Sequence, residues 1–221
     1  MPRCVADKLV GVRSPLLFTL GLVLAAPAAA QPACPERLEP GTFRERLEQV
    51  LPGVTSGEQG IGDRLAVLEA TAVHCIDGPL FSGDLASLFL AQGVWALSQA
   101  DGDAQWGQTR VSWAAALGGE GVWRAEYDDL RTIFDGALSA NETATLILQI
   151  TPTPPVLVLD GQVEYGMGSR TVNAGAHLVQ WMENGGWNGE LVVLSPGATE
   201  TFSRGEAPVE APVEGSAGTI T

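Results

Sequence analysis

Basic residues are the scarcest feature of this 221-residue chain. It carries 12 Lys and Arg against 26 Asp and Glu, a formal net charge of −14, and its one lysine is Lys8. A field of this sign repels nucleic acid and anionic lipid. The lack of any later lysine argues against Schiff-base chemistry and against phosphate-clamping lysines. The sequence therefore predicts no nucleic-acid partner.

Long apolar runs are also missing, except near the N-terminus. Basic residues precede an apolar run over residues 15–26, which is too short for a stable membrane span. Residues 28–30 are three alanines, the small residues that a signal peptidase requires. We therefore expect residues 1–30 to be a signal peptide and the mature protein to be periplasmic or extracellular, without a stable membrane span. A lipoprotein is the disfavoured alternative, because residues 31–33 lack the Leu expected three places before Cys34.

Cysteine is rare as well, with three in the chain. Cys4 belongs to the predicted signal peptide, which leaves Cys34 and Cys75 in the mature protein. In an oxidising compartment an even pair predicts a disulfide. Two cysteines without neighbouring histidines are a poor zinc site, so we expect no metal and no cofactor.

Five stretches between residues 40 and 140 have helical periodicity. Their apolar stripes begin at Phe43, Ile61, Leu85, Trp106 and Trp123. The first stretch starts at a capping box over residues 42–45, and Pro52 is expected to end it. Short connections containing glycine separate the five stretches, so residues 31–140 are predicted to form a small helical bundle.

The third and fourth stretches resemble a tetratricopeptide-type helix pair. Gly93–Leu97 and Trp113–Leu117 lie on either side of Asp101-Gly102-Asp103, and the closing Pro of that repeat is missing. The likeness covers one repeat unit, whereas three are the usual minimum for a stable stack. The resemblance implies that the two helices pack against each other as they do in those repeats, and it favours protein binding as the function. Asp103 is expected to cap the helix that follows it.

From Thr143 onward the apolar period changes to two. Strands are expected near residues 156–160, 170–173, 176–182, 187–194 and 198–203. Asn184-Gly185-Gly186 predicts a tight hairpin turn between two of them. Residues 204–221 repeat Pro, Ala and Glu and are expected to form a disordered acidic tail.

Residues 155–203 resemble the PEGA family of small β-sandwich modules in bacterial envelope and secreted proteins. A strand ends in the turn Asp160-Gly161, and Asn173-Ala174-Gly175-Ala176 stands where that family has Pro-Glu-Gly-Ala. The Gly and the Ala match, while the Pro and the Glu do not. The expected fold class is therefore α+β in two parts: a helical bundle over residues 31–140 and an antiparallel, PEGA-like β-sandwich over residues 141–203.

Catalytic signals are weak. The mature chain keeps two histidines, His74 and His177, and no Gly-x-Ser-x-Gly elbow accompanies them. His177 shares a predicted strand face with Val179 and Trp181, so we expect a buried, hydrogen-bonded structural histidine. Carboxylates are plentiful, so a pair of them carries little information. We expect no catalytic residue.

Tryptophan is the residue type that is most over-represented, with six in the chain. Four recur at helical spacing and are expected in the core. Trp181 and Trp187 flank the predicted hairpin turn, where they either stack on a partner or stabilise the hairpin across its strands.

The sequence thus predicts a non-catalytic exported envelope protein that binds or scaffolds a protein or glycan partner, with Trp187 and Trp181 as the candidate binding residues. A periplasmic or secreted hydrolase using carboxylates is the alternative. The oligomeric state is left open.

Overall fold

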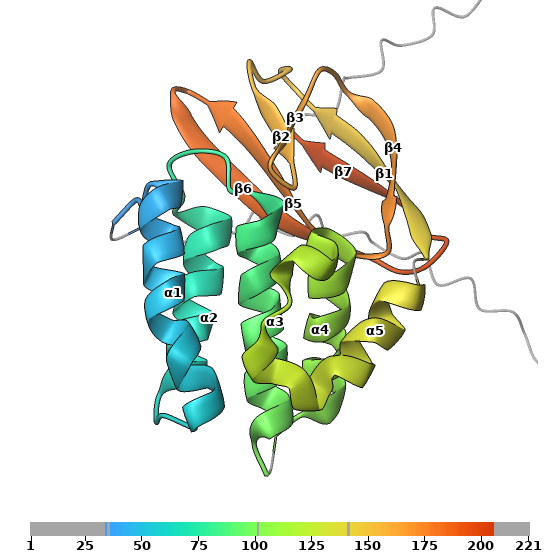
Figure 1. The fold of residues 1–221 in the computed structure, drawn as a ribbon. Coiled ribbons are helices and arrows are strands. Elements are labelled where there is room, and N and C mark those ends of the chain that lie inside the picture. Colours follow the sequence, from blue (N-terminus) through green and yellow to red (C-terminus); the bar gives the residue numbers. More distant parts are fainter. Residues whose placement is uncertain (1–33, 35, 101, 141, 206–221) are drawn as a thin grey trace, which may run out of the picture. The chain divides into compact units, whose positions relative to one another are not determined.

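Helices fill the first half of the described chain and strands fill the second half (Figure 1). The computed structural model describes residues 34, 36–100, 102–140 and 142–205. The predicted signal peptide and residues 206–221 of the predicted tail lie outside the described residues. The predicted start of the tail at residue 204 is wrong, because Arg204 is the last residue of a strand that pairs with residues 145–150. The architecture is α+β, as the sequence predicts, with helices first and two β-sheets after them.

The helical part contains five α-helices in the described residues. They are α1 (Pro40–Ser56), α2 (Ile61–His74), α3 (Ser82–Ser98), α4 (Ala104–Gly118) and α5 (Arg131–Ala140). Two 3₁₀ helices, η1 (Gly119–Val122) and η2 (Ala125–Leu130), connect α4 to α5. Helix α3 contacts α1, α2 and α4, so buried residues occupy most of its circumference. The predicted cap of α4 is confirmed, because the Asp103 side chain accepts a hydrogen bond from the Trp106 N–H at 2.9 Å.

Helix α1 differs from its prediction at both ends. It begins at Pro40 instead of Thr42, since the fixed φ of proline suits the first helical position. It also continues through Pro52 and ends before Gly57, whose φ of 68° is left-handed and whose N–H bonds the Gly53 carbonyl. Glycine in this conformation is a common helix end. The helix tolerates Pro52 in its last turns, where the missing N–H costs one hydrogen bond.

The predicted pairing of Cys34 with Cys75 is confirmed. Their Cα atoms are 5.5 Å apart and their sulfurs are bonded. Next to this disulfide, Leu38 and Ile76 form an isolated β-bridge. The segment before α1 is therefore attached to the end of α2 both covalently and by backbone pairing. Among the described helices, none is long and apolar enough to cross a lipid bilayer.

The strands form two sheets. One has the order β4–β1–β7, from β4 (Gly168–Asn173), β1 (Thr143–Ile150) and β7 (Thr199–Arg204). The other has the order β3–β2–β5–β6, from β3 (Gln162–Glu164), β2 (Leu157–Leu159), β5 (Gly175–Glu183) and β6 (Gly186–Leu194). The expectation of purely antiparallel strands is wrong for one pair, because β7 runs parallel to β1. The chain leaves β6 and crosses to the other sheet before β7, so β7 has no hairpin neighbour in its own sheet.

Strand β5 is buried on both faces. Ala176 and Leu178 belong to the hydrophobic cluster of the helices. Val179 and Trp181 belong to a second cluster, which also contains side chains from β1 and β7 of the other sheet. Alternate residues of a strand point to opposite faces. Helices therefore cover one face of β5, and the β4–β1–β7 sheet covers the other.

A buried glutamine fixes β5 to the segment between α2 and α3. The Gln180 side chain is 1 % exposed. Its Oε1 accepts from the Leu80 N–H at 2.8 Å, and its Nε2 donates to the Gly78 carbonyl at 3.1 Å. The change from helix to strand falls at the predicted position near residue 140. That the two parts are separate domains stays a prediction.

Candidate binding site beside strand β6

The hairpin that the sequence marks as a binding site is formed by β5 and β6. Its two-residue turn is Asn184-Gly185, with φ values of 53° and 77°, as a tight hairpin turn requires. Trp181 lies opposite Asn188, and Trp187 lies opposite Met182. Residues directly opposite each other share a face of the sheet. The two indoles therefore lie on opposite faces and make no joint aromatic surface.

Trp181 is a core residue. It is 4 % exposed, and its ring packs edge-on against Phe202 with 5.6 Å between centroids. It joins the cluster between the two sheets, so its indole serves the fold.

Trp187 lies on the helix-facing side of β6, together with Leu191. It is half-buried, and its carbonyl accepts a hydrogen bond from Arg37 Nη1 at 2.9 Å. A binding role for Trp187 stays a prediction, and it would have to act without Trp181.

His177 is the buried, hydrogen-bonded histidine that the sequence predicts. It is 3 % exposed. Nδ1 lies 2.7 Å from Asp160 Oδ2, and Nε2 lies 2.7 Å from the Asn173 carbonyl oxygen. Both neighbours are acceptors, so both ring nitrogens have to donate, which favours the imidazolium. Burial alone lowers the pKa of His177, but the hydrogen bond and charge of Asp160 and the Asn173 carbonyl outweigh it and raise the pKa above its ordinary value.

A cavity of about 370 Å³ lies beside the His177–Asp160 pair. Ser82, Thr143 and Thr171, which carry hydroxyl groups, are among the residues that line it. A nucleophilic hydroxyl needs a base with a free lone pair. His177 offers none, because Asp160 and Asn173 take both nitrogens. The pair therefore holds β5 to the neighbouring turn and strand instead of activating a nucleophile.

A larger cavity, of about 610 Å³, lies where α4 and α5 meet the ends of β4, β5 and β6. The Trp113 indole and the alanine-rich surface of α4 are on one side, and Val193, Ser195 and Pro196 are on the other. Val193 is 53 % exposed. Among the described residues that line this cavity, Glu142 is the one with an ionisable side chain. Such a wall suits binding better than acid–base chemistry.

Stacking holds the aromatic wall of the larger cavity in place. Arg110 lies over the rings of Trp113 and Phe89, with Cζ 4.7 Å and 5.1 Å from their centroids. Its Nη1 bonds Glu69 at 2.7 Å, and Gln92 donates to the same carboxylate at 2.9 Å. The cation is largely shielded from solvent by these contacts. Side chains of α2, α3 and α4 therefore hold the Trp113 indole in its orientation.

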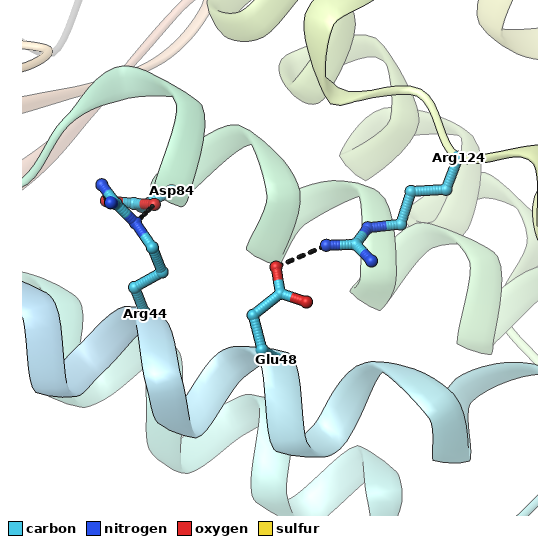
Figure 2. A network of polar contacts seen from close by, with 4 residues as sticks. All are labelled: Arg44, Glu48, Asp84 and Arg124. Atoms are coloured by element: carbon cyan, nitrogen blue, oxygen red, sulfur yellow. Dashed lines mark hydrogen bonds and ion pairs between the residues drawn. The ribbon is translucent and has the colours of Figure 1, made fainter.

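A second polar network joins α1 to the rest of the helical part. Figure 2 shows Arg44 and Glu48 on one side of α1, with Asp84 of α3 and Arg124 of the η1–η2 connection facing them. Arg44 binds Asp84 in a two-pronged arrangement at 2.7 and 2.8 Å. The hydrogen bond and charge of Asp84 raise the pKa of Arg44. The pairs join α1 to α3 and to the η1–η2 connection, so we assign them to helix packing.

The larger cavity is not predicted by the sequence. Its wall comes from four segments, near residues 109–119, 137–142, 173–175 and 193–196, and no local pattern brings them together. One signal was present, because the Asn173-Ala174-Gly175 part of the PEGA-like motif lies in that wall. In the described residues, no group of three metal-ligating side chains comes together.

No protein-family model, no curated protein and no solved structure matches this chain.

Proposed function

We propose that this chain is a non-catalytic binding or scaffolding module of the bacterial cell envelope. In this proposal it is exported by residues 1–30, ends in an acidic tail over residues 206–221, and uses a PEGA-like β-sandwich over residues 141–203 to hold a protein or glycan partner. The rival proposal is an exported hydrolase that uses carboxylates.

The sandwich part of the proposal is supported by the packing of the strands. A hydrophobic cluster draws side chains from both sheets, including Leu148 of β1 and Leu159 of β2. Asp160-Gly161 closes the β2–β3 hairpin with φ values of 51° and 79°. Asp160 also accepts a hydrogen bond from the Leu178 N–H of β5 at 2.9 Å. The turn that carries the resemblance thus ties two strands of one sheet together.

The larger cavity is the main observation that supports a binding function. Its wall combines a fixed indole, an exposed valine and backbone groups at the ends of three strands. Concave sites with an apolar wall and a few polar groups are where proteins bind ligands and partner side chains. A carboxylate hydrolase would need two converging carboxylates. Glu142 has no second carboxylate among the described residues of this wall.

The experiment is affinity capture from envelope extract with the mature chain as bait, followed by binding measurements with the captured partner. Ser195 is exposed in the wall of the larger cavity. Ser195→Trp should fill the cavity and weaken the complex by about tenfold or more. Ser203→Trp is the matched control on the exposed surface of β7, and it should bind like the wild type.

Two results would contradict this proposal. One is turnover of an envelope polysaccharide or peptide by the purified chain, which would favour the hydrolase. The other is equal binding by the wild type and Ser195→Trp, which would remove the larger cavity from the site.

A further inference from the structure

Strand β6 is an edge of its sheet. It pairs with β5 and with no other strand of the described chain. With nine residues it is longer than the other edge strands, since β3 has three residues and β4 and β7 have six each. An edge strand presents unpaired N–H and C=O groups along its outer side.

The register identifies these outward groups. On β5, the Met182 N–H and the Leu178 carbonyl bond toward β2, so the even-numbered residues of β5 face away from β6. Glu183 pairs with Gly186 next to the turn. The even-numbered residues of β6 consequently bond to β5, and its odd-numbered residues direct their N–H and C=O groups outward.

Part of this edge is already covered. The outward carbonyl of Trp187 accepts from Arg37. On the helix-facing side of the strand, α2 lies against Gly189, where an added Cβ would clash with the Val73 carbonyl oxygen. Leu191 and Val193 follow. Among the described residues, none bonds to their outward N–H or C=O groups.

The open end of β6 leads into the larger cavity. Val193, Leu194, Ser195 and Pro196 all line it. An extended segment paired with Leu191 and Val193 would run beside Val193 and reach the mouth of this cavity. Main-chain bonds supply affinity in such strand addition, and pockets for alternate side chains supply specificity.

The net charge of the chain indicates which charge a partner segment should have. The chain has a net charge of −14. Eight of the nine arginines in the described residues already pair with carboxylates. Glu142 adds a carboxylate at the cavity itself. A basic segment is attracted to this surface, whereas a second copy of the chain is repelled.

We infer that β6 is a docking strand for an extended, basic segment of a partner protein, which pairs with Leu191 and Val193 and places an apolar side chain in the larger cavity. This inference rests on the proposed binding function and commits it to a protein partner.

The test uses the mature chain and a displayed library of random ten-residue linear peptides. Enriched peptides are synthesised, and their Kd values are measured for the wild type, Val193→Pro and Val193→Ala. Proline removes the outward N–H of residue 193 and leaves the bonds to β5, a position where edge strands accept it. Alanine keeps the N–H and trims the exposed side chain.

We expect the enriched peptides to be basic and rich in β-branched residues. Val193→Pro should raise their Kd by about tenfold or more, and Val193→Ala by about threefold or less. Amide exchange of Leu191 and Val193 in the wild type should slow when the peptide is added. This last readout stands even where Val193→Pro is poorly folded.

Other results would overturn the inference. These are a library without enriched peptides, peptides that bind Val193→Pro as tightly as the wild type, or self-association through β6 without peptide binding. Where the chain still binds a glycan or a folded partner from envelope extract, the proposed binding function stands and strand addition alone is wrong. Where nothing binds in either experiment, both are wrong.

Discussion

At the scale of single residues, His177 gives a pH dependence of stability with a defined sign. Its folded-state pKa is raised, so the folded protein holds this proton more tightly than the unfolded chain. The resulting stabilisation is complete below the unfolded pKa of histidine and is lost as pH rises through the folded pKa. The free energy of unfolding from urea titration should therefore fall as pH rises from below the ordinary pKa of histidine through its raised folded-state pKa.

His177→Gln should flatten this fall, since glutamine does not titrate. Asp160→Asn is the matched control for the partner, because it removes the carboxylate that stabilises the imidazolium and should also reduce the slope. An unchanged slope in His177→Gln would assign the pH dependence to another group.

The two hairpin tryptophans should differ in their contribution to stability. Trp181 is enclosed between the sheets and packs on Phe202, so Trp181→Ala should lower the free energy of unfolding by about 3 kcal/mol or more. Trp187 is half-buried on the opposite face, so Trp187→Ala should cost less than half as much. Denaturant titration of both variants measures the difference. Equal losses would mean that Trp187 is as much a core residue as Trp181.

At the scale of elements, the two sides of β6 should exchange their amide hydrogens at different rates. The N–H groups of Glu190 and Val192 face β5, whereas those of Leu191 and Val193 face outward. We expect slow exchange at 190 and 192 and fast exchange at 191 and 193, measured by NMR on the free protein. Val179 of the central strand β5 is the internal reference for slow exchange. Uniformly slow exchange along β6 would show that its edge is covered in solution.

The sequence predicted elements well where the signal is local. The Asn184-Gly185 turn fixes the β5–β6 hairpin, and Asp103 fixes the start of α4. Pro52 misled the prediction of α1, because the helix continues through the proline to bury Val54 in spite of the lost hydrogen bond and the crowding of the preceding turn, and it ends at Gly57. The parallel pairing of β7 with β1 joins residues more than fifty positions apart, and strand alternation carries no information about such a partner. The larger cavity was missed for the same reason.

At the scale of the whole molecule, Gln180 should connect the stability of the helices to that of the sheets. Gln180→Met keeps a similar shape but leaves the Leu80 N–H and the Gly78 carbonyl without their partners. Buried unpaired groups of this kind cost about 1–3 kcal/mol each. We expect a loss of about 2 kcal/mol or more, seen equally by far-UV circular dichroism and by tryptophan fluorescence. Gln149→Met on the exposed side of β1 is the control and should have little effect.

Coincident transitions by the two probes would indicate that the helical and β parts unfold as one unit. If either probe showed two separate transitions, the parts would be separate domains, as the sequence predicts.

The double burial of β5 has a consequence for how the chain reaches its native state. This strand joins the helical cluster to the cluster between the sheets, yet it follows α2, α3 and α4 by about sixty to a hundred positions along the chain. Contacts of such long sequence separation form late and slow the folding rate. Until β5 arrives, the helices expose the surface that later receives Leu178, and the segment from Ala176 to Trp181 is itself an unprotected apolar strand. We expect refolding from urea to lose yield steeply as protein concentration rises, because association between partly folded chains competes with the closure of β5.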